Sequence, residues 1–161
     1  MIRSLVILLT ALVASACTMR SYTAEGFEVL LPGELHSPNP DDHDRKIALR
    51  TGNIVSATVN ATQIKDGSTQ VNLRIKPRTG VPMSLVSQSV GFAVCTGGAA
   101  GSIDFRPPVI VDGTYMFLAY LPVHDKCIRV ELPAIDLNGE RLSLGTIELR
   151  HITRTLRWTG V

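Results

Sequence analysis

Apolar and polar residues alternate along much of this chain, and this period of two constrains the fold more than any other feature. The alternation is clearest over residues 54–64 and 70–76, and it recurs over 27–31, 128–132 and 147–150. Such a pattern is typical of β-strands that place one face on a core and the other in water. We therefore expect a chain built mainly of half-buried strands.

Turn dipeptides separate several of these runs. Asp66-Gly67, Asp112-Gly113 and Asn138-Gly139 each stand between two segments of alternating character. These residue pairs readily adopt the positive φ angles that a two-residue type I′ hairpin requires. Because so short a loop cannot join parallel strands, the three dipeptides predict antiparallel connections.

Three segments depart from simple alternation. Residues 82–95 fit either one face of a helix or, over 90–94, a strand. The run 115–121 is apolar on both faces and is expected to be a central, covered strand. Near the C-terminus the apolar positions change from odd to even numbers, which predicts a bulge or bend near His151.

Length and composition favour a single globular domain. The chain has 161 residues, of which 45% are apolar and 19% charged, so it is neither disordered nor long enough for two ordinary domains. The expected architecture is an antiparallel β-sandwich, immunoglobulin-like or similar, of roughly seven to ten strands, with one short helix at 82–95 as an option. The alternatives are an α+β layer or a small barrel.

The N-terminus has the layout of a secretory signal peptide. Arg3 precedes an apolar run at 4–13, and the small residues 14–16 follow. The run is too short to span a membrane, which takes about 20 apolar residues. We expect residues 1–16 to be removed, 17–25 to form a short tether, and 26–161 to form the β-rich domain.

Ala14-Ser15-Ala16-Cys17 resembles the lipobox of bacterial lipoproteins. It departs from the family pattern at its first position, where Leu is usual and Ala14 stands here. The resemblance implies cleavage before Cys17 and acylation of that cysteine, for example with palmitate, which would hold the chain on the periplasmic side of a membrane. Thr18, in place of an aspartate, favours the outer membrane. Ordinary signal cleavage at the same bond is the alternative.

The odd number of cysteines is consistent with acylation of Cys17. Cys17, Cys95 and Cys127 are the three cysteines, so acylation of the first leaves a pair for an oxidising compartment. A bridge between Cys95 and Cys127 would close a loop worth about 3.7 kcal/mol on the chain-entropy model. The alternative is two buried free thiols.

The densest group of potential metal ligands is Asp41-Asp42-His43-Asp44, with His36 upstream. Carboxylates and imidazoles are metal ligands, but adjacent residues of one loop rarely converge on a single ion. We therefore favour a solvated turn, and no cofactor is expected. Residues 95–101 are rich in glycine but lack the lysine and hydroxyl of a phosphate-binding loop.

A basic edge closes the chain, formed by Arg150, Arg154, Arg157 and Trp158. It could contact lipid headgroups or another anionic envelope component, although charges on a terminal strand also protect it from pairing with other strands. The formal net charge of +2 is too small to predict nucleic-acid binding.

These features favour a membrane-anchored envelope protein that acts as a non-catalytic binding or assembly module. An accessory subunit of an envelope or secretion complex is one alternative. A small envelope hydrolase or metal-dependent enzyme is another, and it would have to use His36, His43, His124 or His151.

Overall fold

The computed structural model describes residues 20–35, 45–49, 52–64 and 66–158, and the side chains of 20–25 and 154–158 are outside that description. The described residues fall into two compact units. One comprises Gly26–Ile152, and the other contains the strand segments 20–25 and 153–158. Strand β1 (Arg20–Leu30) begins within the segment expected to be a tether.

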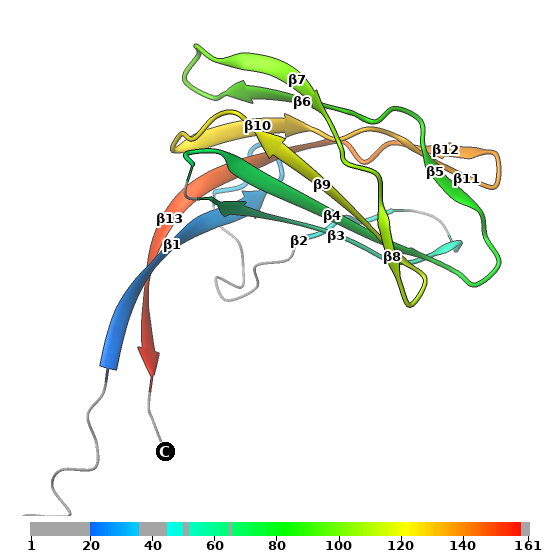
Figure 1. Cartoon of the computed structure of the whole chain (residues 1–161), viewed down its shortest axis with the longest axis horizontal. Coiled ribbons are helices and arrows are strands. Elements are labelled where there is room, and N and C mark those ends of the chain that lie inside the picture. Colours follow the sequence, from blue (N-terminus) through cyan, green and yellow to red (C-terminus); the bar gives the residue numbers. More distant parts are fainter. Residues whose placement is uncertain (1–19, 36–44, 50–51, 65, 159–161) are drawn as a thin grey trace, which may run out of the picture. The chain divides into compact units, whose positions relative to one another are not determined.

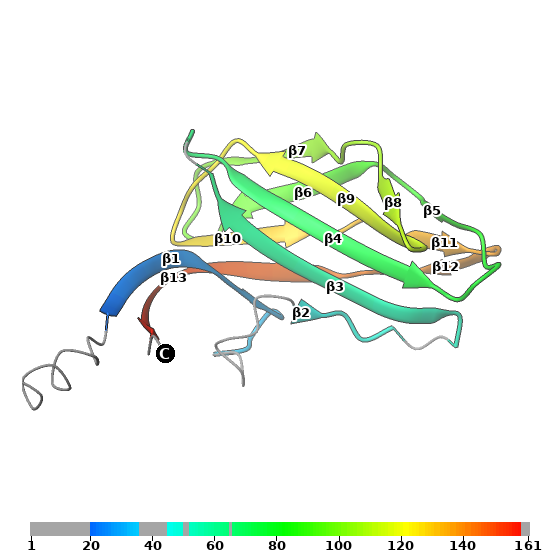
Figure 2. The ribbon, with the colours of Figure 1, turned by 60° about the horizontal axis from the view of Figure 1, so that its bottom comes forward.

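The described part of the chain is all β, with three antiparallel sheets and no helix (Figures 1 and 2). The first sheet has the order β1 (Arg20–Leu30), β13 (Thr146–Trp158), β10 (Cys127–Glu131), β6 (Ser89–Val94), β7 (Ala100–Asp104). The second has the order β2 (Arg45–Lys46), β3 (Ile54–Gln63), β4 (Thr69–Pro77), β9 (Thr114–Leu121), β8 (Val109–Val111). The small third sheet has the order β12 (Glu140–Leu142), β11 (Ile135–Leu137), β5 (Met83–Leu85). The predicted sandwich-like class is confirmed, with more strands than expected.

The core of the Gly26–Ile152 unit lies between the two larger sheets, and the period-two pattern explains its composition. Every second residue of the long strands turns inward, which removes its side chain from water. The second sheet contributes Val59, Val71, Leu73, Ile75, Phe117, Ala119 and Leu121. The first sheet contributes Val90, Ile128, Val130, Ile147 and Leu149.

Residues 82–95 form strands β5 and β6, so the helix option is wrong. Val90 and Val94 are buried, and β6 pairs on both sides, with β10 and with β7. Pairing with two neighbours satisfies the backbone of β6, and packing of the sheet on the core buries one of its faces. A helix over the same residues would have carried the cost of Gly91 in its interior.

Two of the three predicted hairpin turns are confirmed. Asp112 and Gly113 have φ angles of 49° and 72°, and Asn138 and Gly139 have 53° and 86°, as a type I′ turn requires. The turn at Asp66-Gly67 differs from the prediction. Ile64 donates its amide hydrogen to the carbonyl of Ser68 at 3.0 Å, so the loop has three residues rather than two.

Strand β9 lies inside its sheet, as predicted, because β4 and β8 flank it. The expected cover on both faces is wrong: Phe117, Ala119 and Leu121 are buried, whereas the alternate residues Met116, Leu118 and Tyr120 are partly exposed. Strand β13 continues through His151 as one strand.

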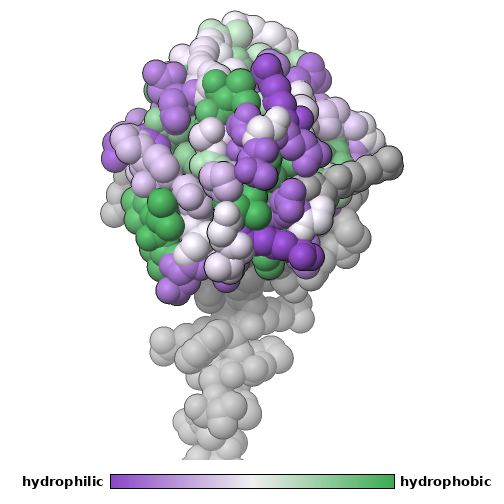
Figure 3. Space-filling view, turned by 90° about the vertical axis from the view of Figure 1, so that its right-hand side faces the viewer, coloured by the Kyte–Doolittle hydropathy of each residue, from purple (hydrophilic) through white to green (hydrophobic). Residues whose placement is uncertain are grey.

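Strand β8 is an edge whose three apolar side chains are about half exposed. Figure 3 shows separate small apolar patches among polar residues on the face that it draws. The β8 length of three residues and the preceding Pro107-Pro108 both discourage pairing with a foreign strand.

Candidate functional site

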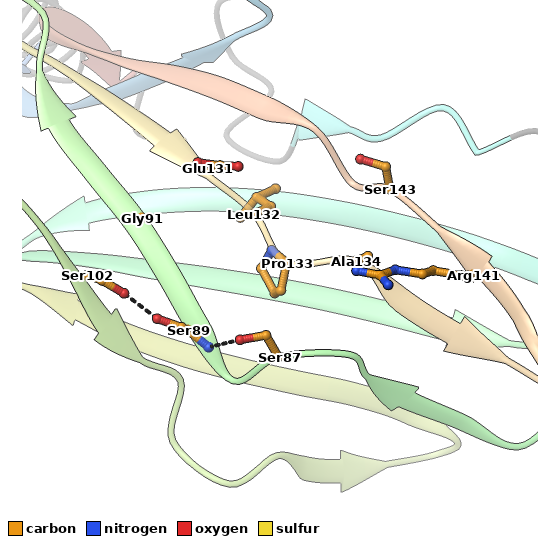
Figure 4. A pocket seen from close by; sticks show the side chains of 10 residues that line it. All are labelled: Ser87, Ser89, Gly91, Ser102, Glu131, Leu132, Pro133, Ala134, Arg141 and Ser143. Carbon is orange, nitrogen blue, oxygen red and sulfur yellow. Dashed lines mark hydrogen bonds between the residues drawn. The ribbon is translucent and has the colours of Figure 1, made fainter.

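An open cleft of about 740 Å³ lies on the face of β6, β7 and β10 that points away from the core. Its volume is within the range of small-molecule sites. Figure 4 shows the side chains that surround it. They are Ser87, Ser89, Gly91, Ser102, Glu131, Leu132, Pro133, Ala134, Arg141 and Ser143.

Sheet register brings the floor of the cleft together. Gly91 of β6 lies opposite Ser102 of β7 on one side and Glu131 of β10 on the other. Since Val90 is buried, alternation places its neighbours Ser89 and Gly91 on the outer face. A Cβ atom at Gly91 would lie 3.4 Å from the Cβ of Glu131. A side chain at this position would therefore pack against Glu131 and fill part of the cleft.

The serines form a short hydrogen-bonded chain along one wall (Figure 4). The hydroxyls of Ser89 and Ser102 share a hydrogen bond, and the hydroxyl oxygen of Ser87 accepts the amide hydrogen of Ser89 at 3.0 Å. Only one hydroxyl hydrogen is used between Ser89 and Ser102, and that of Ser87 has no acceptor among the residues that the structure describes. This wall therefore retains O–H groups that can donate to a ligand.

Two opposite charges line the cleft and come from different strands, Arg141 from β12 and Glu131 from the end of β10. Within the described residues neither makes an ion pair or a side-chain hydrogen bond, and both are exposed. Asp136 lies opposite Arg141 in the sheet, but its carboxylate accepts the amide hydrogen of Gly139 at 2.8 Å.

A smaller hollow of about 260 Å³ adjoins the cleft and shares Gly91 and Glu131 with it. Arg129 lines this hollow and is 3.2 Å from a carboxylate oxygen of Glu148, whose other oxygen is 3.2 Å from Arg150. The hydrogen bond from Arg129 lowers the pKa of Glu148 below its ordinary value; burial opposes this, and Arg150 adds to it.

The Cys95–Cys127 bridge is present. Cys95 follows Val94 and Cys127 precedes Ile128, and Val94 and Ile128 are paired at the end of the β6–β10 ladder. The amide of Cys95 donates to the carbonyl of Cys127 at 3.0 Å, and the Cα atoms are 5.4 Å apart. Strand pairing therefore holds the two sulfurs within bonding reach.

Two of the four predicted histidines meet around Phe27. The ring centroids of His124 and His151 are 5.5 Å apart and nearly perpendicular, and Phe27 packs edge-on to both. The nearby Asp125 carboxylate accepts the amide hydrogen of Cys127 at 3.4 Å. Across the described residues no three His, Cys, Asp or Glu side chains gather as a metal-binding group.

The remaining predicted site residues have mixed outcomes. Arg150 is half-buried and lies 3.2 Å from Glu148. Cys17, His36, Asp41, His43 and Asp44 lie outside the described residues, as do the side chains of Arg154, Arg157 and Trp158. In the part of the chain that the structure describes, no helix has the length and apolar character needed to cross a membrane.

Sequence reasoning missed the cleft altogether. Ser87, Ser89 and Ser102 are 29 or more residues away from Glu131 and Arg141, and isolated serines carry no motif. A comparison of the chain with protein-family models, with curated proteins and with solved structures found no match. The cleft is therefore interpreted from its own chemistry.

Proposed function

We propose that this chain is an envelope lipoprotein, exported through residues 1–16 and anchored through an acylated Cys17. On this proposal the β-sandwich is a non-catalytic binding module on the periplasmic side of the membrane, with the cleft as its binding site. Several acyl chains give stable attachment, where a single chain gives only marginal binding.

The disulfide is the observation that carries the proposal. Cys95 and Cys127 are bonded to each other, so Cys17 is left over among the three cysteines. Disulfides persist in oxidising compartments such as the periplasm. An unpaired cysteine directly behind a signal-peptide pattern is thereby supported as a site of covalent modification.

The lining of the cleft supports binding rather than hydrolysis. A serine nucleophile needs an adjacent base, most often a histidine. Ser89 and Ser102 bond to each other and Ser87 to a backbone amide, and the cleft lining contains no histidine. Hydroxyls beside one cation and one anion are instead suited to holding a polar ligand.

Replacement of Cys17 by serine tests the anchor. In a bacterial host we expect the wild type in the membrane fraction, with an intact mass that begins at Cys17 and includes acyl chains. We expect Cys17→Ser to lose the acyl mass and leave the detergent-extracted fraction. A Cys95→Ser/Cys127→Ser variant is the matched control and should remain membrane-bound. A wild-type protein that is soluble and carries no acyl mass would overturn the proposal.

A further inference from the structure

From the cleft between β6, β7, β10 and β12 we infer a binding site for a short zwitterionic peptide, whose carboxylate is held by Arg141 and whose ammonium group is held by Glu131. The inference rests on the proposed function, because it names the ligand of the proposed binding module. It depends on three properties of the cleft: its uncommitted charges, its hydrogen-bond donors and acceptors, and its lack of an aromatic platform.

The first property is the contrast between paired and uncommitted charges. Glu148 is held between Arg129 and Arg150, and Glu34 is paired with Arg45. By comparison, Arg141 and Glu131 line one cleft without a salt bridge in the described part of the chain. A ligand with both charges could pair with each of them, and such charge-assisted hydrogen bonds are about twice as strong as neutral ones.

The second property is the balance of donors and acceptors. The guanidinium of Arg141 carries five N–H donors and no acceptor. Ser143 and Ser87 each bring a hydroxyl, and one more is left over from the Ser89–Ser102 pair. Serine hydroxyls both donate and accept. Away from Glu131 the cleft thus offers donors to the carbonyl and carboxylate oxygens of a peptide and acceptors to its amide hydrogens. In Figure 4 the side chain of Arg141 extends towards Pro133 and Ala134, so its guanidinium group lines the cleft.

The third property separates a peptide from a sugar. Binding sites for neutral glycans commonly stack a sugar face on an aromatic ring, and none of the ten lining residues is aromatic. Phe92 lies in the adjoining hollow, but its ring is 3.1 Å from the position that a Cβ of Gly101 would take. The ring is therefore packed under β7 rather than presented to a ligand. The short apolar wall at Leu132–Ala134 suits small aliphatic side chains.

Binding of trialanine to the purified mature chain tests the inference. Near neutral pH trialanine has both charges, N-acetyl-trialanine lacks the ammonium group, and trialanine amide lacks the carboxylate. We expect trialanine to shift backbone amide signals of the cleft residues, with a millimolar Kd, and each blocked form to bind about tenfold more weakly. Triacetylchitotriose, a neutral glycan, should bind no better than the blocked peptides.

Two substitutions test which group of the ligand is bound by Arg141 and which by Glu131. Arg141→Gln should weaken trialanine binding about tenfold and abolish the preference for the acid over the amide. Glu131→Gln should abolish the preference for the free amine over the acetylated form. The matched controls are Arg78→Gln and Glu140→Gln, which replace exposed charges that do not line the cleft. Well-dispersed amide spectra show that each variant is folded.

The inference is overturned if all three peptides bind equally, if the glycan binds better than trialanine, or if none of the four probes shifts the cleft signals at millimolar concentration. These measurements use protein in solution and do not depend on anchoring. A failure here leaves the fractionation result for Cys17 unchanged, and a failure of the anchor leaves the peptide result unchanged.

Discussion

Cys95 and Cys127 lie next to each other across the β6–β10 ladder, where the amide of one donates to the carbonyl of the other and their sulfurs are bonded. The bridge joins residues 32 positions apart in the sequence. It therefore fastens β6, which forms the floor of the cleft, to β10, which supplies Glu131.

Removal of this bridge should destabilise the protein while leaving the strands in place. For Cys95→Ser/Cys127→Ser we expect the free energy of unfolding to fall by about 3–4 kcal/mol, because the unfolded chain gains the entropy of an open loop. Urea denaturation monitored by circular dichroism measures the change. A reductant should lower the stability of the wild type and not that of the variant. A loss below about 1 kcal/mol would show that the loop is constrained by other means.

Replacement of Glu148 by glutamine should produce a pH-dependent loss of stability. Because Arg129 and Arg150 lower the pKa of Glu148 in the folded state, its contribution is present above the pKa of the unfolded chain and is lost as the pH falls through the folded pKa. We expect Glu148→Gln to cost about 1 kcal/mol near neutral pH, with the gap to wild type closing in acid. Urea titrations at several pH values test this, and Glu140→Gln on the exposed hairpin is the control. A gap that widens in acid would contradict the assignment.

A cavity in the core should cost far more than a truncation on the surface. Leu73 is completely buried between the sheets, so Leu73→Ala removes three heavy atoms that the neighbours cannot fully replace. We expect a loss of about 3 kcal/mol or more. Val55→Ala, on a side chain that is 62% exposed, should change stability by less than about 0.5 kcal/mol. Similar losses for the two variants in thermal or urea unfolding would argue against the core described above.

The turn before β12 should be sensitive to a side chain at its second position. Gly139 has a φ of 86°, in the region that L-residues avoid, so Gly139→Ala should destabilise the protein by about 1 kcal/mol. Asn138→Gly, at the other positive-φ position of this turn, should be nearly neutral. Because β12 carries Arg141, Gly139→Ala should also broaden the amide signals of the cleft. Unchanged stability and unchanged cleft signals would show that the turn tolerates a β-carbon.

Much of the fold could be predicted from local patterns, because apolar and polar residues alternate in a strand that has one buried face. The alternation alone predicts Val59, Leu73 and Ile128 on the core side, and they are buried. Asn138-Gly139 and Asp112-Gly113 were predicted as type I′ turns because their backbone requirement is local to two residues.

Other features depended on neighbours that lie far away in the sequence. Residues 82–95 carry weak signals for both helix and strand, and pairing of β6 with β10 and β7 decided between them. The cleft is a stronger example, since Ser89, Ser102, Glu131 and Arg141 share no local motif and meet only through sheet register and the placement of β12. The sequence by itself determined most of the residues that turn inward, because burial of a strand face needs only alternation. Val55 is one exception, since it alternates with Val59 but is 62% exposed where the register of β3 shifts. The tertiary structure alone decided which outward residues share a surface, because that depends on which strands become neighbours.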